Sequence, residues 1–389
     1  MLAAVAALAV LIYWYAFIFE VSNFKLSEIE IFLKRRVEKS QGVASQATAS
    51  QTEKSQADNT ESHPEFSVLH LSDFHLRKDA KGQKLFKFIQ SLKSIIPVPD
   101  FILITGDLIE KNENFPFLFK MLEGLNAIYG KFAVFGVHDY FNKTPSEFLK
   151  NMIKRKKEYK RPNDVTELIA KLNSIGIKVL KNENITFRLD KKTAPIGQIN
   201  NVTIIGVEDS IIKRTDVAKA FAGLNNSAGL NNMPKIMPPV QQNDFGKVVT
   251  AKEEKNMIDK DAMDYHLYAM GRNKNRYEQT FKSSSSSLHT LNTGGTIRIV
   301  LTHTPDMDLL VDLSDKNVDV VLCGHTHGGQ IRLPGVGALI SGCNIKTKYC
   351  SGLFYFNNFV LYTTRGLGEG RYSPFRFYCQ PEATLIKFY

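Results

Sequence analysis

Six short apolar runs recur along the chain and constrain its fold more than any other feature. They are rich in β-branched and aromatic residues, as strands buried on both faces of a sheet are. The runs lie at 66–72, 101–105, 132–136, 202–207, 297–303 and 318–324, with helix-compatible segments between them at 83–94, 115–129 and 163–174. This alternation predicts an α/β domain, and further runs at 359–364 and 383–389 indicate a more β-rich final part.

An uncharged run of 18 residues, Leu2 to Phe19, stands near the start of the chain. It is long enough to cross a bilayer as a helix, and it lacks the basic start and small exit residues of a cleaved signal peptide. We therefore expect a single-pass transmembrane anchor over 1–20, with a buried core helix as the alternative. The first basic cluster, Lys34 to Arg36, favours the cytoplasmic side for the rest of the chain.

The remaining chain divides into three parts by composition. Residues 24–32 alternate apolar and polar positions, which predicts a first strand within a juxtamembrane segment, 21–36. Residues 37–65 are rich in Ser, Gln, Ala and Thr, which predicts a low-complexity linker. The main domain is expected over 66–389, interrupted at about 211–295 by a partly disordered insertion with one helix around 251–271.

The overall charge and the cysteines exclude some classes of protein. The formal net charge of +11 favours anionic partners such as phosphates or acidic lipid surfaces. The basic residues are scattered, so no nucleic-acid partner is expected, and the oligomeric state is left open. Four cysteines without a C-x-x-C pair make no disulfide scaffold and favour a reducing compartment. Neither a G-x-x-x-x-G-K-[ST] loop nor a G-x-S-x-G motif is present.

Acidic residues and histidines follow five of the apolar runs. They are Asp73, His75, Asp107, His138, His303, His325 and His327. In an open α/β sheet, ligands bind outside the carboxyl ends of the strands, so these side chains are expected to converge there. Each has an ordinary structural explanation when taken singly. Together, carboxylates and imidazoles suit Mn, Fe, Zn or Co, and two such metals commonly promote attack on phosphorus.

The order of these motifs resembles that of the calcineurin-like metallophosphoesterases. The matching motifs are D-x-H at 73–75, G-D at 106–107, G-x-H-D at 136–139, LTHTPD around His303 and G-H-T-H at 324–327. The motifs GHTHGGQ, TRGLGEG and PFRFYCQPE are similar to those of a bacterial, membrane-anchored subgroup. The resemblance implies a four-layer fold in which two packed mixed β-sheets are flanked by helices.

The resemblance also implies a role for each residue. Asp73, His75 and His327 would hold one divalent metal, His303 and His325 the other, and Asp107 would bridge them. The metals implied are Mn, Zn or Fe. A hydroxide between them would be the nucleophile, and His138 would stabilise developing charge or protonate the leaving oxygen.

The sequence departs from the family pattern at Val137, where the family has an Asn that binds the second metal. Valine offers no donor atom, which leaves three interpretations. Water or a nearby side chain such as Asp139 fills the gap and the protein is an active enzyme. Alternatively, the second metal binds weakly, or the protein is a degenerate module that binds a ligand without hydrolysing it.

A membrane-anchored enzyme of this kind would meet amphiphilic substrates. The expected reaction is hydrolysis of a phosphodiester or pyrophosphate, and the subgroup includes pyrophosphatases for UDP-2,3-diacylglucosamine. Arginines of the Gly-rich final part are candidates to bind phosphate oxygens. These are Arg332, Arg365, Arg371 and Arg376.

Overall fold

The structure is a computed structural model of the whole chain. It describes residues 1–34, 63–110, 115–142, 144–153, 159–189, 199–224, 274–284, 288–292, 295–370 and 372–389. The linker predicted at 37–65, except its last three residues, lies outside these ranges. So do residues 225–273 of the predicted insertion, with the helix expected near 251–271.

Two large sheets form the centre of the molecule. The first has the strand order β10 (Leu288–Thr290), β1 (Lys25–Lys34), β17 (Glu382–Phe388), β2 (Phe66–Leu71), β3 (Phe101–Thr105), β4 (Gly130–Val134) and β7 (Ile177–Val179). The second has the order β15 (Gly352–Tyr355), β16 (Val360–Thr363), β12 (Val320–Cys323), β11 (Thr296–Leu301), β9 (Asn201–Gly206) and β8 (Glu183–Arg188). All eight apolar runs singled out in the sequence are strands of these sheets.

Both sheets are mixed, but their central strands are parallel. β2, β3, β4 and β7 run parallel to one another, as do β9, β11, β12 and β16. β17 is antiparallel to β2, and β8 and β15 are antiparallel edge strands. The carboxyl ends of the parallel strands therefore meet at one edge of each sheet, where the site residues were expected.

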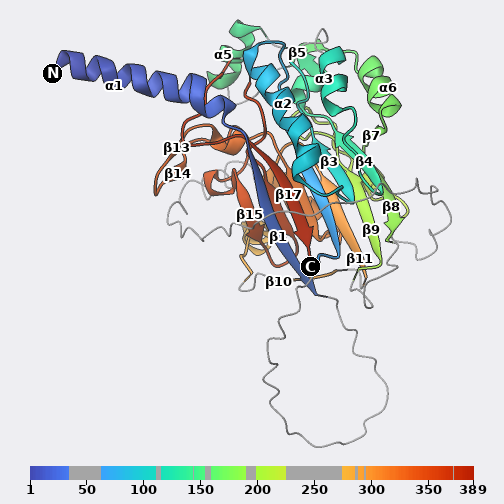
Figure 1. Cartoon of the computed structure of the whole chain (residues 1–389). Coiled ribbons are helices and arrows are strands. Elements are labelled where there is room, and N and C mark those ends of the chain that lie inside the picture. The colour runs from blue at the N-terminus through green and yellow to red at the C-terminus, as the bar shows by residue number, and fades with distance from the viewer. Residues whose placement is uncertain are drawn as a thin grey trace, which may run out of the picture.

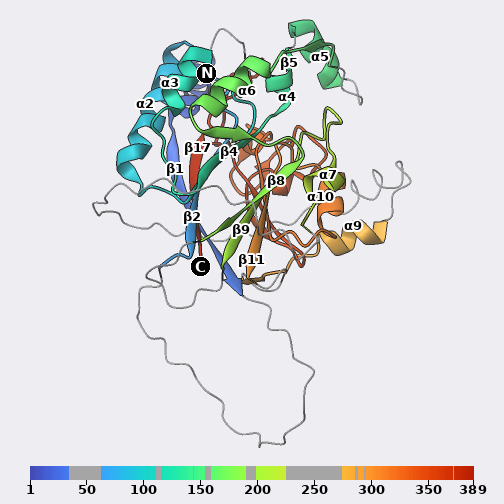
Figure 2. The ribbon, with the colours of Figure 1, turned by 90° about the vertical axis from the view of Figure 1, so that its right-hand side faces the viewer.

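The two sheets pack face to face around an apolar core. The first sheet contributes Val68, Leu103, Phe132 and Ile386, and the second contributes Ile204, Ile299, Leu322 and Tyr362. Helices α2 (Ala80–Ile95), α3 (Phe115–Leu122) and α6 (Thr166–Ser174) cover the outer face of the first sheet, and α7 (Val217–Ala220), α9 (Lys274–Thr280) and α10 (Met307–Leu313) lie beside the second (Figure 2). The expected fold class, four layers with two mixed sheets flanked by helices, is confirmed.

Local sequence explains where the covering helices begin and end. Asp79 caps α2 by accepting a hydrogen bond from the Gly82 amide at 2.9 Å, and Leu85, Ile89 and Leu92 form its buried face at helical spacing. The prediction for 115–129 was too long, because α3 ends at Leu122 and Gly124 then adopts φ +76°. That left-handed conformation ends a helix and suits glycine.

The N-terminal helix projects away from the sheets, as Figure 1 shows. α1 (Leu2–Trp14) continues as a π-helical turn, Tyr15–Phe19, and a 3₁₀ turn, Glu20–Ser22. By length and composition this helix can cross a membrane, and only 6% of it is buried inside the molecule. It is therefore not a core helix, which removes that alternative.

The remaining described elements are short. They are β5 (Phe141–Asn142) paired with β6 (Arg161–Pro162), β13 (Arg332–Leu333) paired with β14 (Gly337–Ala338), α4 (Val137–Tyr140) and α5 (Pro145–Ile153). Of these, α4 carries the departure from the family pattern, and β13 begins five residues after the last histidine of the G-H-T-H motif.

Candidate metal centre

Loops at the carboxyl ends of the strands bring the predicted ligands together in strained conformations. Asp73, His75, Asp107, His325 and His327 all have positive φ, between 40° and 66°. For residues other than glycine, this conformation costs about 1 kcal/mol or more each, and it persists where the surroundings enforce it. The loops that leave β2, β3 and β12 are thus held in shape for the positions of their side chains.

The first cluster joins Asp73, His75 and His327. The Nε2 atoms of the two histidines lie 3.1 Å apart, and the Nε2 of His327 is 3.6 Å from Oδ1 of Asp73. The Nδ1 of His75 donates to Glu110 at 2.6 Å, and the Nδ1 of His327 donates to the carbonyl oxygen of Gly368 at 2.9 Å. In their neutral forms both rings then carry their proton on Nδ1, so two Nε2 lone pairs and a carboxylate face one another. Such a donor set fits a cation.

The second cluster joins Asp107, His303 and His325. The Nδ1 of His303 donates to the carbonyl oxygen of Thr105 at 2.6 Å, which leaves its Nε2 as an acceptor in the neutral ring. That Nε2 lies 3.1 Å from Oδ2 of Asp107 and 3.2 Å from Nδ1 of His325. Ligand atoms about 3 Å apart are what metal bonds of about 2.1 Å produce. This cluster fits a second cation.

Asp107 connects the two clusters. Its Oδ2 lies 3.1 Å from His303 and 3.5 Å from His75, and its Oδ1 accepts a hydrogen bond from the His138 amide at 2.9 Å. Gly136 leaves room for this arrangement, because a β-carbon there would come within 2.2 Å of Oδ1 of Asp107. The carboxylate expected to bridge two metals therefore lies between the two clusters.

The electrostatics of the clusters also indicate a place for positive charge. Burial disfavours the imidazolium of His75, but Glu110 and the neighbouring aspartates outweigh it and raise its pKa to about 8. At His303 the effect of burial is likewise outweighed by the charge of Asp107, so the pKa of His303 is raised well above its ordinary value. The histidines in turn hold the pKa of Asp107 well below its usual range, despite its burial. A bound metal takes the place of such protons.

His138 lies at the rim of this arrangement. Its ring packs edge-on against that of His75, with centroids 4.8 Å apart, and its Nδ1 is 3.6 Å from Oε1 of Glu110. The side chain is partly exposed, unlike the fully buried ring of His303. The structure therefore places His138 beside the candidate ligand His75 and within reach of solvent.

Asp139 does not replace the missing Asn ligand. Its Oδ2 accepts hydrogen bonds from the amides of Asp107 and Gly136, and its Oδ1 accepts one from Leu108, all at 2.8–2.9 Å. Burial and the nearby Asp107 raise its pKa to about 7. Asp139 therefore holds two loops together, and the suggestion that it fills the gap left by Val137 is not supported.

Two acidic residues near the centre were missed in the sequence. Glu110 is buried and accepts the hydrogen bond of His75, and His138 and His75 hold its pKa well below the usual range despite that burial. Asp209 is buried beside the second cluster and accepts hydrogen bonds from Thr304 Oγ1 at 3.1 Å and from the Ile211 amide. Both follow strands, in ITGDLIE and IIGVED, which is the signal that would have identified them.

The four candidate arginines differ in burial and in hydrogen-bond partners. Arg376 is fully buried, and its guanidinium donates to the carbonyl oxygens of Arg365, Gly366, Gly368 and Cys379. It supports the loop beside His327, so its prediction as a phosphate ligand is corrected. Arg332 and Arg365 are partly exposed and donate to Gly328 O and Ser351 Oγ, each at 3.0 Å. Arg371 lies outside the described residues.

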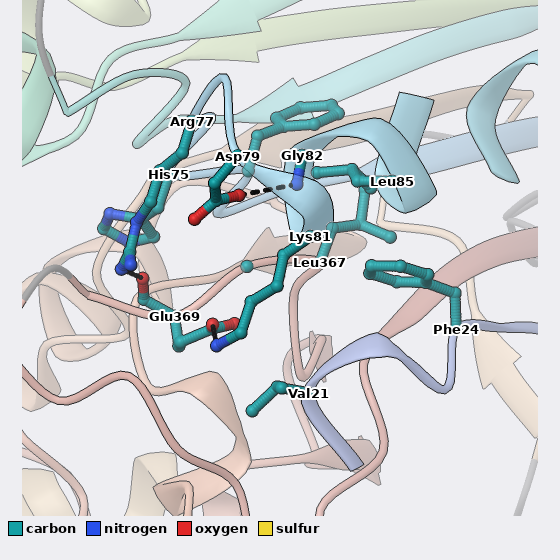
Figure 3. A pocket seen from close by; sticks show the side chains of 12 residues that line it. Val21, Phe24, His75, Arg77, Asp79, Lys81, Gly82, Leu85, Leu367 and Glu369 are labelled. Atoms are coloured by element: carbon teal, nitrogen blue, oxygen red, sulfur yellow. Dashed lines mark hydrogen bonds and ion pairs between the residues drawn. The ribbon is translucent and has the colours of Figure 1, made fainter. Parts of the chain in front are cut away.

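A pocket lies on the far side of the loop that carries His75 (Figure 3). It is partly open to solvent, and its empty space of about 290 Å³ includes part of that open solvent. Val21 and Phe24 of the juxtamembrane segment line it together with Leu85 and Leu367. Lys81 and Glu369, which form an ion pair at 2.6 Å, also line it. The pocket therefore connects the end of the N-terminal helix to the loop that carries His75.

Comparison with known proteins agrees with this site. The family model of calcineurin-like phosphoesterases matches residues 66–218. The uncharacterized metallophosphoesterase YkoQ of Bacillus subtilis (strain 168) is 24% identical over 310 residues, 78% of this chain and 77% of YkoQ. The phosphodiesterase YaeI of Escherichia coli (strain K12) is 41% identical over 90 residues, 23% of this chain and 32% of YaeI.

A further relative is the UDP-2,3-diacylglucosamine pyrophosphatase LpxG of Chlamydia muridarum (strain MoPn / Nigg). It is 23% identical over 357 residues, 82% of each chain. The matched family, the metallophosphoesterase relatives and the two clusters of ligand-type side chains agree with one another. Over residues 66–218 the chain therefore matches the calcineurin-like phosphoesterases, and its relatives with assigned activities are a phosphodiesterase and a pyrophosphatase, both hydrolases.

Proposed function

We propose that this protein hydrolyses a phosphodiester or pyrophosphate bond of a membrane-associated substrate with two divalent metal ions. Asp73, His75 and His327 would hold one ion, His303 and His325 would hold the other, and Asp107 lies where it could contribute to both. When bound, the ions supply a water that is acidic enough to attack phosphorus near neutral pH, and they neutralise phosphoryl charge. Mn, Zn and Fe suit this mixture of carboxylate and imidazole.

One observation supports the proposal most strongly. Two histidines on loops far apart in the sequence, His75 and His327, have their Nδ1 protons engaged by acceptors and their Nε2 atoms 3.1 Å apart. Two facing lone pairs repel unless a cation or a proton lies between them. The protein holds this geometry with strained backbone at both residues, which argues for a function in that position.

Two further side chains of the centre have supporting roles: Glu110 positions a ligand, and His138 acts on the leaving oxygen. Glu110 fixes the tautomer and orientation of His75 through its Nδ1 hydrogen bond. His138, partly exposed beside the ligands, donates a proton to the leaving oxygen or stabilises its charge. Its backbone amide keeps Asp107 oriented through the 2.9 Å hydrogen bond to Oδ1.

The alternative function is a degenerate module that binds a phosphorylated ligand without turnover, because Val137 offers no oxygen. Val137 is buried at the start of α4, and Asp139 does not compensate for it. Three protein ligands still remain at the second cluster, which is the usual number at a catalytic metal that also binds water. This count favours the active enzyme.

The proposed substrate is an amphiphilic nucleotide-linked or lipid-linked phosphate, such as UDP-2,3-diacylglucosamine. The N-terminal helix, proposed as a membrane anchor, would keep the centre near a bilayer, and the pocket lined by Val21 and Phe24 offers apolar surface beside it. The similarity to LpxG at 23% identity supports this choice of substrate. The catalytic domain is proposed to lie on the cytoplasmic side, and reporter fusions at its C-terminus would test that orientation.

The decisive experiment is hydrolysis of bis(p-nitrophenyl) phosphate by the full chain in detergent, titrated with Mn²⁺ and Zn²⁺. If the protein is an enzyme, we expect turnover that depends on metal. Asp107→Ala should lower that rate by about three orders of magnitude, because it removes several kcal/mol of charge stabilisation. Absence of turnover at every metal concentration would refute it and leave the binding module. Metal analysis separates the cases further, because two ions per chain support a complete site and one implicates Val137. UDP-2,3-diacylglucosamine in mixed micelles then tests the substrate.

A further inference from the structure

The hairpin at residues 331–340, which contains β13 and β14, carries an unusual group of exposed apolar side chains. Outside the first 22 residues, this segment holds more exposed large hydrophobic side chains than any other described stretch of ten residues. Leu333, Val336, Leu339 and Ile340 all lie there, and Val336 and Ile340 are 58% and 61% exposed. Single exposed hydrophobic residues are ordinary, but a contiguous group marks an interaction surface.

The hairpin lies on the same side of the molecule as the N-terminal helix. Figure 1 shows β13 and β14 beneath the point where α1 leaves the domain. Ile331 pairs with Phe377, and the Arg332 amide donates to the Phe377 carbonyl at 2.9 Å. Phe377 in turn packs against Tyr15 of the N-terminal helix, with ring centroids 5.5 Å apart. One segment, 375–377, therefore supports both the hairpin and the end of the helix.

The charge around the hairpin suits an anionic surface. No Asp or Glu occurs between residues 320 and 368, whereas Arg332, Lys346 and Lys348 flank the apolar group. Basic residues beside an apolar surface are attracted to anionic lipid headgroups. Tyr378 next to the supporting segment is 57% exposed, and exposed tyrosine and tryptophan are frequent at membrane interfaces. A soluble protein partner would not explain the position of the hairpin beside α1.

We propose that the hairpin 331–340 inserts into the surface of an anionic phospholipid bilayer beside the N-terminal helix, as a second membrane contact of this chain. The hairpin begins four residues after His327, and its base packs tightly against Gly329, just after the G-H-T-H motif. A β-carbon on Gly329 would come within 2.5 Å of the Ala338 side chain. Contact with lipid through the hairpin therefore orients the metal centre toward phosphates at the bilayer surface.

The inference rests on the proposed membrane anchor, and fluorescence separates the two. Trp14 is the single tryptophan of the chain and lies in α1. In vesicles of phosphatidylcholine and phosphatidylglycerol, lipids brominated on the acyl chains should quench Trp14 if the helix is inserted. Unquenched Trp14 would refute the anchor and, with it, the hairpin contact.

The hairpin itself is tested in a Trp14→Phe background of the full chain. Val336→Trp places one indole on the hairpin. The matched control, Ile128→Trp, places it at another exposed apolar position (47%), two residues before β4 and away from the ligand-bearing edge. We expect brominated lipid to remove emission from the indole at 336 and to leave that at 128 unchanged. Two results would overturn the proposal: tryptophan emission that brominated lipid quenches in neither variant, or emission that it quenches equally in both. Equal melting temperatures confirm that both variants are folded.

Discussion

Glu110 provides the sharpest test of the proposed metal centre, because its hydrogen bond would orient the candidate ligand His75. Its Oε1 accepts the Nδ1 proton of His75 at 2.6 Å in a buried site. Without the carboxylate, His75 is free to carry its proton on Nε2, where that proton faces His327 and excludes a cation. Removing such a hydrogen-bond partner of a metal-binding histidine typically lowers metal affinity or activity by about 10–100-fold.

The magnitude depends on what replaces the carboxylate. Glu110→Gln keeps an oxygen that can accept the proton of His75 but loses the charge, so we expect the lower half of that range. Glu110→Ala removes the acceptor, so we expect the upper half, about 2–2.7 kcal/mol. Because the defect is in affinity, saturating Mn²⁺ should restore most of the rate of Glu110→Gln.

The assay is the initial rate of bis(p-nitrophenyl) phosphate hydrolysis against Mn²⁺ concentration, with metal content measured on the same samples. Glu123→Gln, at an exposed position after α3, is the matched control and should behave as the wild type. If Glu110→Ala binds Mn²⁺ and turns over like the wild type, the geometry of His75 does not depend on Glu110 and the reasoning fails.

Three further predictions follow from the described contacts. Val137→Asn should lower the Mn²⁺ concentration needed for half-maximal rate with little change at saturation; an unchanged metal titration would mean that the three remaining ligands already suffice. Arg376→Met should lower the free energy of unfolding by about 3 kcal/mol, since several buried carbonyls lose a charged donor, while KM stays unchanged at saturating metal; a higher KM without destabilisation would restore Arg376 as a substrate ligand. Burial lowers the pKa of His70 to about 3, so the unfolded chain binds the extra proton between about pH 6.5 and 3. The free energy of unfolding should therefore fall by about 1.4 kcal/mol for each unit by which the pH decreases in that window. This part of the pH dependence should disappear in His70→Asn; an unchanged pH dependence in the variant would contradict the prediction.

The sequence alone determined most of the secondary structure and the ligand types of the site. Each apolar run became a strand, because burial on both faces requires a continuous apolar stretch and β-branched residues suit it. Asp73, His75, Asp107 and His303 could be chosen as candidates because a chain that leaves the carboxyl end of a parallel strand delivers its next residues to the edge where ligands bind in such sheets. Both properties are local in the chain.

Only the tertiary structure decided how those side chains are used. His75 and His327 are separated by 252 positions, and no local pattern tells which of their nitrogens face each other. The same holds for Glu110 and Asp139, two carboxylates near Asp107, of which one orients a histidine and the other binds backbone amides. Arg376 looked like a phosphate ligand because its chemistry allows it, yet the fold buries it among carbonyl oxygens. Sequence thus determines which groups are available, whereas packing of distant segments determines which partners those groups meet.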